Sequence, residues 1–390
     1  MLLFDLMACQ PIGDTANHGG KEYAEAIFCE IIRKGYAVSG IYDSRVNCNR
    51  KFLEYCQFRG ELIDVNKCTL QESIDSGKYS SFYSAIPYHY DNIRWGNIKF
   101  IGNIHGLRDI EVFTDKYEYF YATTFYQKVT AIAKKNSLVK KYKIAKDKAR
   151  LWKILNNPSF ICLTGTMHSK YSILLNFPEL ESSNIHVFCD PLIIENVSAS
   201  SCNTIGKYHL LVSGNRWIKN TLRGILALDE LISAGKIETK VVVTGVVGNM
   251  PWINRIHNKD SFIFKGYVSS NELACLFKDA YCLVFLSLSE GFGYPPLEAI
   301  SRNVPVISSP LTAIYEVYQD GALYCDRKKY FAAAFSRAAE EWRLERLLSS
   351  ALFPFASFLS YPKMKTQPPV KPFSPSASAW CPVSEIVFSL

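Results

Sequence analysis

An apolar run that passes through a glycine turn into a proline-led helix start constrains the fold of this chain more than any other feature. The run Tyr281–Leu288 is almost entirely apolar and predicts a buried strand. Residues 290–298 follow it and read Glu-Gly-Phe-Gly-Tyr-Pro-Pro-Leu-Glu. The glycines predict a tight turn, and the two prolines fit the first turn of a helix, where the backbone needs no N–H partner. A buried strand that turns straight into a helix is typical of an α/β fold with a parallel sheet.

The turn within residues 290–298 also indicates a chemical role. A helix that starts beside glycines presents free backbone N–H groups and the positive end of its dipole to an anion. Glu290 stands at the mouth of the turn, and Glu298 lies about two helical turns further along, within reach of a ligand's hydroxyl groups. An anion site flanked by two hydroxyl acceptors suits a sugar nucleotide.

Residues 290–298 resemble the Glu-x7-Glu signature of retaining GT-B glycosyltransferases, in particular the group 4 family with its glycosyltransferase "group 1" domain. The resemblance is clearest over residues 205–325 and fainter over residues 1–190. It implies an α/β fold of the GT-B type, in which two Rossmann-like domains face each other across an interdomain cleft. Five segments occur in that family's order and spacing: Phe264–Val268, Glu272–Leu273, Ser287–Ala299, Pro305–Ser308 and Glu316–Val317.

The first half of the chain begins like a Rossmann-like βαβ unit. Leu2–Met7 predicts a strand, Lys21–Lys34 a helix and Ala37–Tyr42 the next strand. Gly19 and Gly20 precede the helix and would let the backbone approach a phosphate closely, although most Gly-Gly pairs are simply turns. In the resembled family, a Gly-Gly loop at this place faces the donor diphosphate and the acceptor.

His105 follows the predicted strand Phe100–Ile104, at the strand end where open α/β sheets bind ligands. A lone histidine at such a place is more often structural. The resemblance favours a function, because family members often carry a histidine here near the donor sugar. The sequence contains no His-x-x-x-His or Cys-x-x-Cys pair, so we predict no metal site, and its 12 cysteines are expected to be free thiols.

Two cations lie between the predicted strand Tyr208–Ser213 and the following helix, namely Arg216 and Lys219. Two cations beside a helix N-terminus suit a diphosphate, although a solvent-facing charged turn is the alternative. In the resembled family, an Arg and a Lys at this junction neutralise the diphosphate as it leaves. Lys219 matches that pattern better than Arg216, because many members place the Arg further upstream.

The resemblance implies further roles for Glu290 and Glu298 and for His105. Glu298 would accept hydrogen bonds from the ribose hydroxyls, and Glu290 would hold hydroxyls of the donor sugar. His105 would approach the sugar from the opposite domain. The anomeric configuration would be retained, and neither a metal nor another cofactor would be needed.

The resemblance also assigns contacts along the backbone. Gly291, Phe292 and Gly293 would cradle the sugar and the phosphate. Tyr267, at the end of the predicted strand Phe262–Val268, would border the nucleobase. The identity of the base, the donor sugar, the acceptor and the linkage all stay open.

The stretch Lys134–Lys153 holds nine Lys or Arg residues and one acid, Asp147. One interpretation is a solvated helix face beside core aromatics. The other is a membrane-surface patch, because basic residues attract anionic headgroups and aromatic rings prefer the interface. The net charge of +8 fits the second, and no nucleic-acid motif is present, so no nucleic-acid partner is predicted. The aromatic residues just upstream are Tyr117, Tyr119, Phe120, Tyr121, Phe125 and Tyr126.

A chain of 390 residues is long enough for two domains. The predicted division is an acceptor domain over 1–195, a linker over 196–206, a nucleotide-sugar domain over 207–350 and an atypical tail over 351–390. The Pro- and Ser-rich composition of the tail predicts disorder. GT-B enzymes commonly end with a helix that crosses back to the first domain, and Tyr330–Leu348 is the only candidate for it.

The predicted function is that of a glycosyltransferase (EC 2.4) which moves a sugar from a nucleotide diphosphate sugar to a glycan or lipid-linked acceptor. Cell-surface polysaccharide or lipopolysaccharide biosynthesis is the expected setting. The main alternative is a non-catalytic GT-B protein that binds a nucleotide or glycan and has a defective C-terminus. Another GT-B enzyme, such as an epimerase or a phosphorylase, and a nucleic-acid binder are the others. Met1–Met7 is too short for a signal peptide, and a cytoplasmic location is expected. A peripheral position at the inner face of the cell membrane would follow from a membrane contact through Lys134–Lys153.

Overall fold

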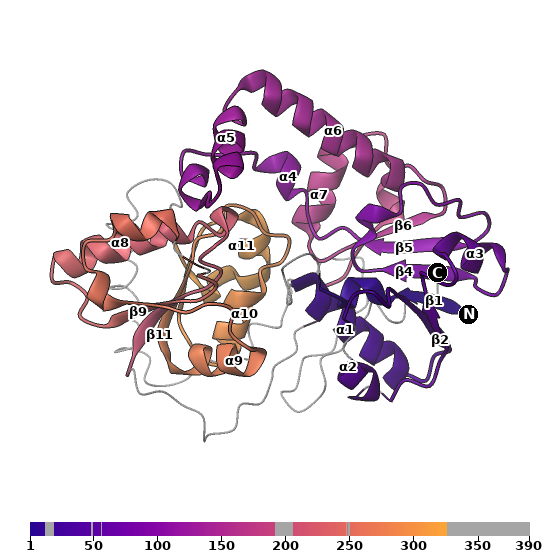
Figure 1. The fold of residues 1–390 in the computed structure, drawn as a ribbon, viewed down its shortest axis with the longest axis horizontal. Coiled ribbons are helices and arrows are strands. Elements are labelled where there is room, and N and C mark those ends of the chain that lie inside the picture. Colours follow the sequence, from indigo (N-terminus) through magenta and orange to yellow (C-terminus); the bar gives the residue numbers. More distant parts are fainter. Residues whose placement is uncertain are drawn as a thin grey trace. The chain divides into compact units, whose positions relative to one another are not determined.

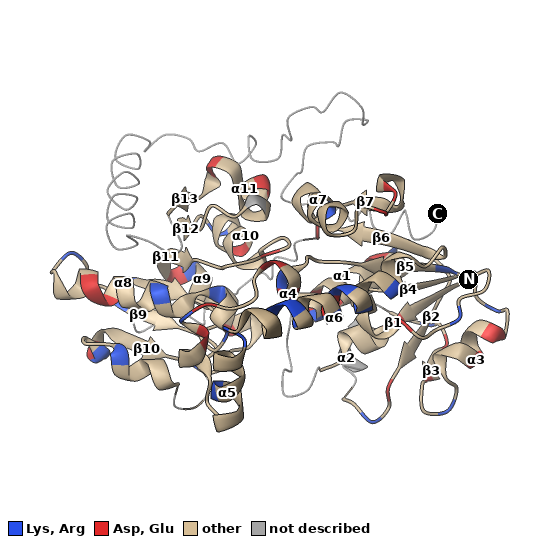
Figure 2. Cartoon of the chain, turned by 90° about the horizontal axis from the view of Figure 1, so that it is seen from above, with Lys and Arg blue, Asp and Glu red and all other residues tan. Residues whose placement is uncertain are grey.

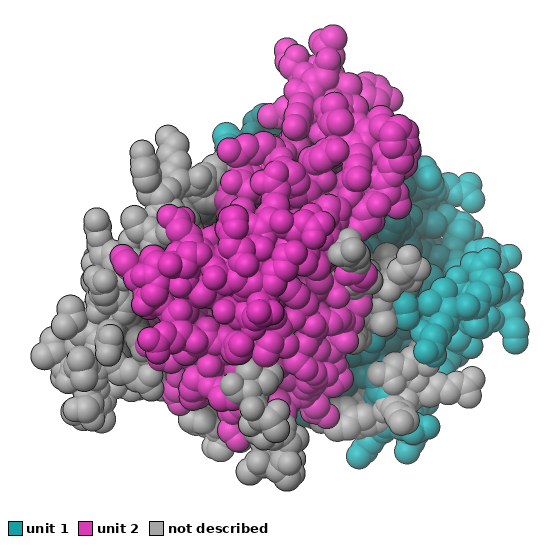
Figure 3. Space-filling model, turned by 60° about the vertical axis from the view of Figure 1, so that its left-hand side comes forward, with its two compact units in different colours: residues 1–110, 144–193, 378–390 teal, residues 111–143, 194–377 magenta. Residues whose placement is uncertain are grey.

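The computed structural model describes residues 1–11, 19–47, 50–55, 57–191, 206–246, 248 and 250–325, which form two α/β units (Figure 1). Unit 1 draws its described residues from Met1–Ile110 and Ile144–Ile193, and unit 2 from Glu111–Lys143 and Ile194–Ala377 (Figure 3). Each unit is Rossmann-like, because each contains one parallel sheet with helices on both faces.

Unit 1 contains a seven-stranded parallel sheet in the order β3-β2-β1-β4-β5-β6-β7. Strand β1 therefore has β2 on one side and β4 on the other, and the strand order reverses at this pair. Ligands of open α/β sheets bind at such a reversal, beyond the carboxyl ends of the strands. The strands are β1 (Leu2–Asp5), β2 (Val38–Tyr42), β3 (Leu62–Asp64), β4 (Ser81–Ser84), β5 (Lys99–Asn103), β6 (Phe160–Thr164) and β7 (Ile185–Val187).

Helices cover both faces of the sheet of unit 1 (Figure 1). Successive residues of a strand point to opposite faces, so Leu2 and Phe4 pack against α1 and α2, whereas Leu3 belongs to the core under α3, α6 and α7. The helices are η1 (Leu6–Cys9), α1 (Gly19–Arg33), α2 (Arg50–Tyr55), α3 (Leu70–Asp75), η2 (Pro87–His89), α4 (Arg108–Glu111), α6 (Ser137–Leu155, whose first residues belong to unit 2), α7 (Met167–Asn176) and η4 (Ser182–Asn184).

Unit 2 repeats this arrangement with six parallel strands in the order β10-β9-β8-β11-β12-β13. Its strand order reverses between β8 and β11. The apolar run that predicts a buried strand forms β11, which ends three residues earlier than expected. The strands are β8 (Tyr208–Leu211), β9 (Lys240–Val243), β10 (Phe262–Phe264), β11 (Ala280–Phe285), β12 (Val306–Ser308) and β13 (Leu323–Tyr324).

The two faces of the sheet of unit 2 also carry separate cores. Helix α8 and the fully buried Trp252 of η6 cover one face, and α9, α10 and α11 cover the other. The helices are η3 (Glu118–Tyr121), α5 (Phe125–Ala133), η5 (Trp217–Lys219), α8 (Thr221–Ser233), η6 (Pro251–Arg255), η7 (Lys259–Ser261), α9 (Ser270–Asp279), α10 (Tyr294–Ser301), α11 (Thr312–Tyr318) and η8 (Gln319–Gly321).

The segment Glu111–Lys143 belongs to unit 2, although the predicted acceptor domain over 1–195 includes it. We call this segment the strap. Its aromatic side chains Tyr117, Phe120 and Tyr121 pack with the core under α8. Of the other predicted boundaries, the linker 196–206 apart from Gly206, the candidate helix Tyr330–Leu348 and the tail 351–390 lie outside the described residues.

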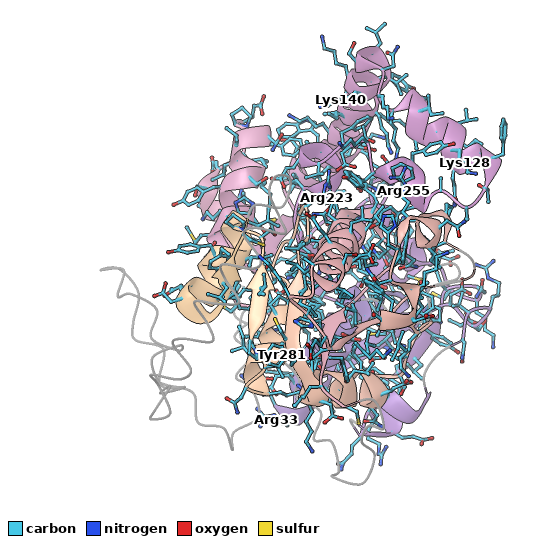
Figure 4. The ribbon with its side chains drawn as sticks, turned by 90° about the vertical axis from the view of Figure 1, so that its left-hand side faces the viewer. Arg33, Lys128, Lys140, Arg223, Arg255 and Tyr281 are labelled. Carbon is cyan, nitrogen blue, oxygen red and sulfur yellow. The ribbon has the colours of Figure 1, made fainter. Side chains whose placement is uncertain are left out.

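Polar contacts hold the strap on unit 2. The backbone N–H of Leu222, in the first turn of α8, donates to the Tyr121 hydroxyl at 2.7 Å. Arg223 pairs with Asp115 at 2.7 Å. Arg255, labelled in Figure 4 with Arg223, stacks its guanidinium 3.7 Å from the centre of the Phe120 ring. These aromatic and ion-pair contacts explain why the strap belongs to unit 2.

Candidate donor-binding site

The strand reversal of unit 2 brings together two loops that are distant in the sequence. Strands β8 and β11 pair in parallel, with Leu210 opposite Leu283, so their carboxyl ends meet at one edge of the sheet. After β8 the chain forms the loop that carries Arg216 and Lys219. After β11 it forms the turn that carries Glu290 and leads into α10.

Lys219 and Glu290 form an ion pair at this edge. The Lys219 Nζ donates to Glu290 Oε1 at 2.6 Å, and the two side chains are only 13% and 11% exposed. The same Nζ lies 5.2 Å from the centre of the Phe285 ring, at the end of β11. The sequence places both residues at strand ends, and the structure joins them into one charged, largely enclosed group.

The loop after β8 is held in a fixed shape. Ser213 and Asn220 have positive φ angles of 61° and 57°, a region that non-glycine residues adopt only when the surroundings require it. A Cβ atom on Gly214 would lie 2.8 Å from Val246 Cγ2, so this loop presses directly against the strand-end loop next to it. Arg223 donates to the Asn220 side chain at 2.6 Å. The loop that carries Arg216 and Lys219 is therefore held in one conformation by its contacts.

The loop after β8 and the loop after β11 are also bonded to each other. The backbone N–H of Leu288 donates to the Ile218 carbonyl at 2.7 Å, and the Ser287 hydroxyl donates to the same oxygen at 3.2 Å. Ile218 stands next to Lys219 in the chain. These bonds therefore fix the spacing of the Lys219–Glu290 pair through the backbone as well as through the side chains.

The predicted glycine turn is confirmed by the backbone of Gly293. This residue is the N-cap of α10 and has a φ of +91°, which favours glycine. The Tyr318 hydroxyl donates to the Gly293 carbonyl, and Pro295 lies in the first turn of the helix. Gly291 and Phe292 belong to the same turn, and the Phe292 ring is buried.

Glu298 lies one turn into α10 and has a partner that sequence reasoning missed. Arg302 Nη2 is 3.5 Å from Glu298 Oε1, and the two side chains are 9% and 23% exposed. An Arg four residues after a Glu on a helix is a recognisable pairing signal. The pair holds the Glu298 carboxylate while leaving it in contact with solvent.

Arg216 and Tyr267 lie at the same edge of unit 2. Arg216 is exposed and is the residue before η5. Tyr267 follows β10, and its exposed ring is held by Asn215, whose side-chain amide donates to the tyrosine hydroxyl at 2.8 Å. Asn215 is a second residue that sequence reasoning missed, because the two partners are 52 positions apart.

Gly19, Gly20 and His105 belong to unit 1, whereas the other predicted site residues belong to unit 2. The two glycines are the first residues of α1. His105 follows β5, and its ring lies 4.8 Å from the Tyr23 ring in an edge-to-face arrangement. Its Nε2 is 3.1 Å from the Ala85 carbonyl oxygen.

Two further observations concern the part of the chain that the structure describes. No cluster of three or more His, Cys, Asp or Glu residues that could hold a metal ion occurs there. None of its helices combines the length and the apolar character required to cross a membrane.

Known proteins resemble this chain in sequence and in fold. The family model "Glycosyl transferases group 1" matches residues 207–341. The O-antigen chain mannosyltransferase RfbU of Salmonella typhimurium is 50% identical over 66 residues, which cover 17% of this chain and 19% of that protein. The O-antigen chain mannosyltransferase B of Escherichia coli is 28% identical over 165 residues, or 39% of this chain and 43% of that protein. The matches thus span less than half of either relative.

A solved structure resembles nearly the whole chain. WaaG, a glycosyltransferase involved in lipopolysaccharide biosynthesis, superposes with a TM-score of 0.59 at 14% identity, over 89% of this chain and 92% of WaaG. At this identity the likeness concerns the fold. Residues 207–341 therefore match the glycosyl transferases group 1 family model, and the chain has the GT-B fold, with two Rossmann-like units, that glycosyltransferases such as WaaG share.

Proposed function

We propose that this chain is a retaining glycosyltransferase (EC 2.4) that moves a sugar from a nucleotide diphosphate sugar to a glycan or lipid-linked glycan. The observation that carries the proposal is the enclosed Lys219–Glu290 pair at the strand reversal of unit 2, beside the N-terminus of α10. An anion-binding helix end and a cation at one strand edge suit a diphosphate.

We propose one role for the positive groups of the site and another for its carboxylates. Lys219, Arg216 and the helix N-terminus stabilise the negative charge that develops on the leaving diphosphate, so no metal is required. Glu290 accepts hydrogen bonds from the sugar and Glu298 from the ribose. Before the donor binds, Glu290 and Lys219 satisfy each other, which keeps both side chains in place.

The donor sugar is proposed to be mannose, and the product an O-antigen or related surface polysaccharide. RfbU of Salmonella typhimurium and mannosyltransferase B of Escherichia coli are both O-antigen chain mannosyltransferases. The more similar of the two stretches is 50% identical, which supports a shared class of donor.

A contact with the membrane surface is a further part of the proposal. Seven of the fourteen exposed large apolar side chains of the described residues fall within residues 125–142. We call these seven the apolar ridge: Phe125, Tyr126, Val129 and Ile132 on α5, and Leu138, Val139 and Tyr142 on α6. Lysines such as Lys128 and Lys140, labelled in Figure 4, share these helices, and α6 carries many of the blue residues of Figure 2.

The structure divides the aromatic cluster that precedes the basic stretch Lys134–Lys153. Tyr117, Phe120 and Tyr121 pack into unit 2, whereas Phe125 and Tyr126 are 84% and 78% exposed. Apolar residues at the helical spacing of 125, 129 and 132 lie on one face of α5. An exposed apolar face with lysines beside it favours an anionic membrane surface, at the inner face of the cell membrane.

Ligand-induced stabilisation tests the donor site. The melting temperature of the full chain is measured with UDP-, GDP-, dTDP- and ADP-sugars, including a GDP-linked mannose. A donor at about 100 times its dissociation constant adds roughly 2.7 kcal/mol to the unfolding free energy. Glu298→Ala should weaken the rise, while Glu272→Ala, which removes an exposed ion pair with Lys265, should leave it unchanged.

Turnover then separates the proposal from its main alternative. Transfer of mannose with an unchanged anomeric configuration, read from the product by NMR, supports the enzyme. Stabilisation by a nucleotide sugar without any transfer supports a non-catalytic binding protein. If no nucleotide sugar stabilises the chain, the proposed donor site is wrong.

A further inference from the structure

Both ring nitrogens of His105 face oxygen acceptors of unit 1. Nε2 lies 3.1 Å from the Ala85 carbonyl oxygen, which can only accept, so this nitrogen carries the hydrogen. Nδ1 lies 3.8 Å from Asp190 Oδ2, which is too far for a hydrogen bond but within ion-pair range when the ring carries a hydrogen on both nitrogens. The side chain of His105 is 30% exposed, so one part of the ring still reaches solvent.

The carboxylate of Asp190 is enclosed to an unusual degree. Its side chain is 3% exposed, and Oδ1 has no hydrogen-bond partner among the described residues. Enclosing a carboxylate without partners is unfavourable by several kcal/mol unless a positive group compensates it. His105 is the one basic side chain for which the described part of the chain shows an ion pair with Asp190.

The fold leaves room for this carboxylate at Gly165. A Cβ atom at position 165 would lie 2.6 Å from Asp190 Oδ1, closer than real contacts allow. Gly165 directly follows β6, the strand next to β5, and His105 follows β5. Any larger residue at 165 would push the carboxylate from its place beside the histidine.

A buried chain of hydrogen bonds braces the ring from another side. The Tyr83 hydroxyl donates to Asn103 Oδ1 at 2.8 Å, and the Asn103 amide donates to the Tyr23 hydroxyl at 2.7 Å. The Tyr23 ring then meets the His105 ring edge to face at 86°. The imidazole thus lies beside a carbonyl from the loop after β4, a carboxylate from the loop after β7 and an aromatic ring of α1.

We infer that Asp190 is a positioning residue for His105, which holds the imidazole in one orientation with Nε2 toward Ala85 and Nδ1 toward the carboxylate. The inference rests on the proposed function, in which His105 approaches the donor sugar. Nε2 bonds to the Ala85 carbonyl and Nδ1 lies beside the Asp190 carboxylate, so the ring of His105 is held in place. It offers the donor a rigid surface, and a displacement of about 1 Å at such a site lowers turnover by about 100-fold.

The isosteric change Asp190→Asn tests the inference in the full chain. We expect kcat to fall about 10- to 100-fold, with the KM for the donor changed less than about threefold. In a His105→Ala background, Asp190→Asn should have no additional effect, because its action passes through the ring. Gly165→Ala displaces the carboxylate without removing it and should lower kcat in the same direction.

Glu30→Gln is the matched control, because it neutralises another little-exposed carboxylate of unit 1, in the ion pair with Arg33. It should leave kcat unchanged. NMR of protein with isotope-labelled histidine gives a readout that is independent of turnover. Asp190→Asn should shift the ring signals of His105, identified by their loss in His105→Ala, and leave the signals of the other six histidines in place.

Two outcomes would overturn the inference. One is additive losses in the double variant, which would mean that Asp190 acts independently of His105. The other is an unchanged His105 ring spectrum in Asp190→Asn. If the unaltered chain transfers no sugar at all, the proposed function fails, and the NMR comparison still decides whether Asp190 holds the ring.

Discussion

At the residue scale, the proposed chemistry depends most on the contact between Lys219 and Glu290. The pair is nearly enclosed, so removal of one partner leaves the other charge without compensation in a poorly solvated place. The same two side chains are proposed to meet the diphosphate and the sugar. Stability and turnover therefore respond to the same substitutions, and the experiment has to measure both.

We predict that Lys219→Ala lowers the unfolding free energy by about 2 kcal/mol, because the Glu290 carboxylate loses its partner. Turnover should fall at least about 100-fold, because charge on the leaving diphosphate is no longer stabilised. Urea unfolding and steady-state kinetics measure the two effects. Lys265→Ala, which breaks the exposed pair with Glu272, should change neither. Normal turnover in Lys219→Ala would contradict the assigned role.

A second residue-scale prediction concerns His209, which is buried in β8 at 2.8 Å from the Thr239 hydroxyl. Burial lowers the pKa of His209 from 6.5 to about 4. The unfolded chain therefore binds a proton at a higher pH than the folded chain does. The unfolding free energy should decrease as the pH falls from about 6.5 to about 4, by at most about 3 kcal/mol from this residue.

Urea unfolding of the native chain and of His209→Gln across this pH range measures the contribution. The comparison is needed because burial also raises the pKa of Asp5, and a carboxyl with a raised pKa stabilises the fold as the pH falls. The variant should show a shallower loss of stability on acidification. Parallel curves for the two proteins would show that His209 does not titrate as predicted.

At the element scale, α5 and the start of α6 carry the apolar ridge. We predict that the full chain co-sediments with vesicles containing anionic lipid and binds purely zwitterionic vesicles less well. Phe125→Ser combined with Leu138→Ser should weaken binding at least about tenfold, because each side chain contributes about 1.5–3 kcal/mol on burial. Tyr315→Ser removes an exposed aromatic outside the ridge and should have no effect. Equal binding by all variants would rule out the ridge as the contact.

The strap supplies a second prediction at this scale. Tyr121→Phe keeps the aromatic ring but removes the acceptor of the Leu222 N–H at the start of α8. A buried N–H without a partner costs about 1–2 kcal/mol, and a urea unfolding curve should show this loss. Tyr126→Phe makes the same change on an exposed tyrosine and should be neutral. Equal stability of both variants would mean that the hydroxyl does not cap α8.

The elements differ in how far the sequence could predict them. The strand, turn and helix around Gly293 were predictable, because the apolar run, glycines and prolines that specify them are contiguous. The packing of the strap against α8 was not predictable, since Tyr121 and Leu222 are 101 positions apart and no local pattern links them. The sequence also could not show that Phe125 is exposed whereas Tyr121 is buried, because both residues occur in one aromatic cluster.

The same physical limit applies to the candidate site. Strand ends beside charged residues made Lys219 and Glu290 predictable individually, but their 2.6 Å contact arises from the pairing of β8 with β11. Arg302 carried a local signal, the four-residue spacing from Glu298. Asp190 carried no such signal, because its neighbours Gly165 and His105 follow other strands and are distant in the sequence.

At the scale of the whole molecule, both sheets begin with the strand order 3-2-1-4-5-6, counted along each unit. Each unit therefore has one strand reversal and one favoured edge for a ligand. Three of the predicted site residues, Gly19, Gly20 and His105, belong to unit 1, and the others belong to unit 2.

The strap also limits where two related proteins of this kind can be recombined. Consider a recombinant that joins residues 1–195 of one protein to the remainder of a relative. Its strap would come from one parent, and the residues that contact the strap, such as Arg223 and Arg255, would come from the other. Substitutions in the strap and in α8 or η6 must then be compatible across the junction. Because residues 111–143 belong to unit 2, a graft that moves unit 2 into another protein has to carry these residues with the second half of the chain.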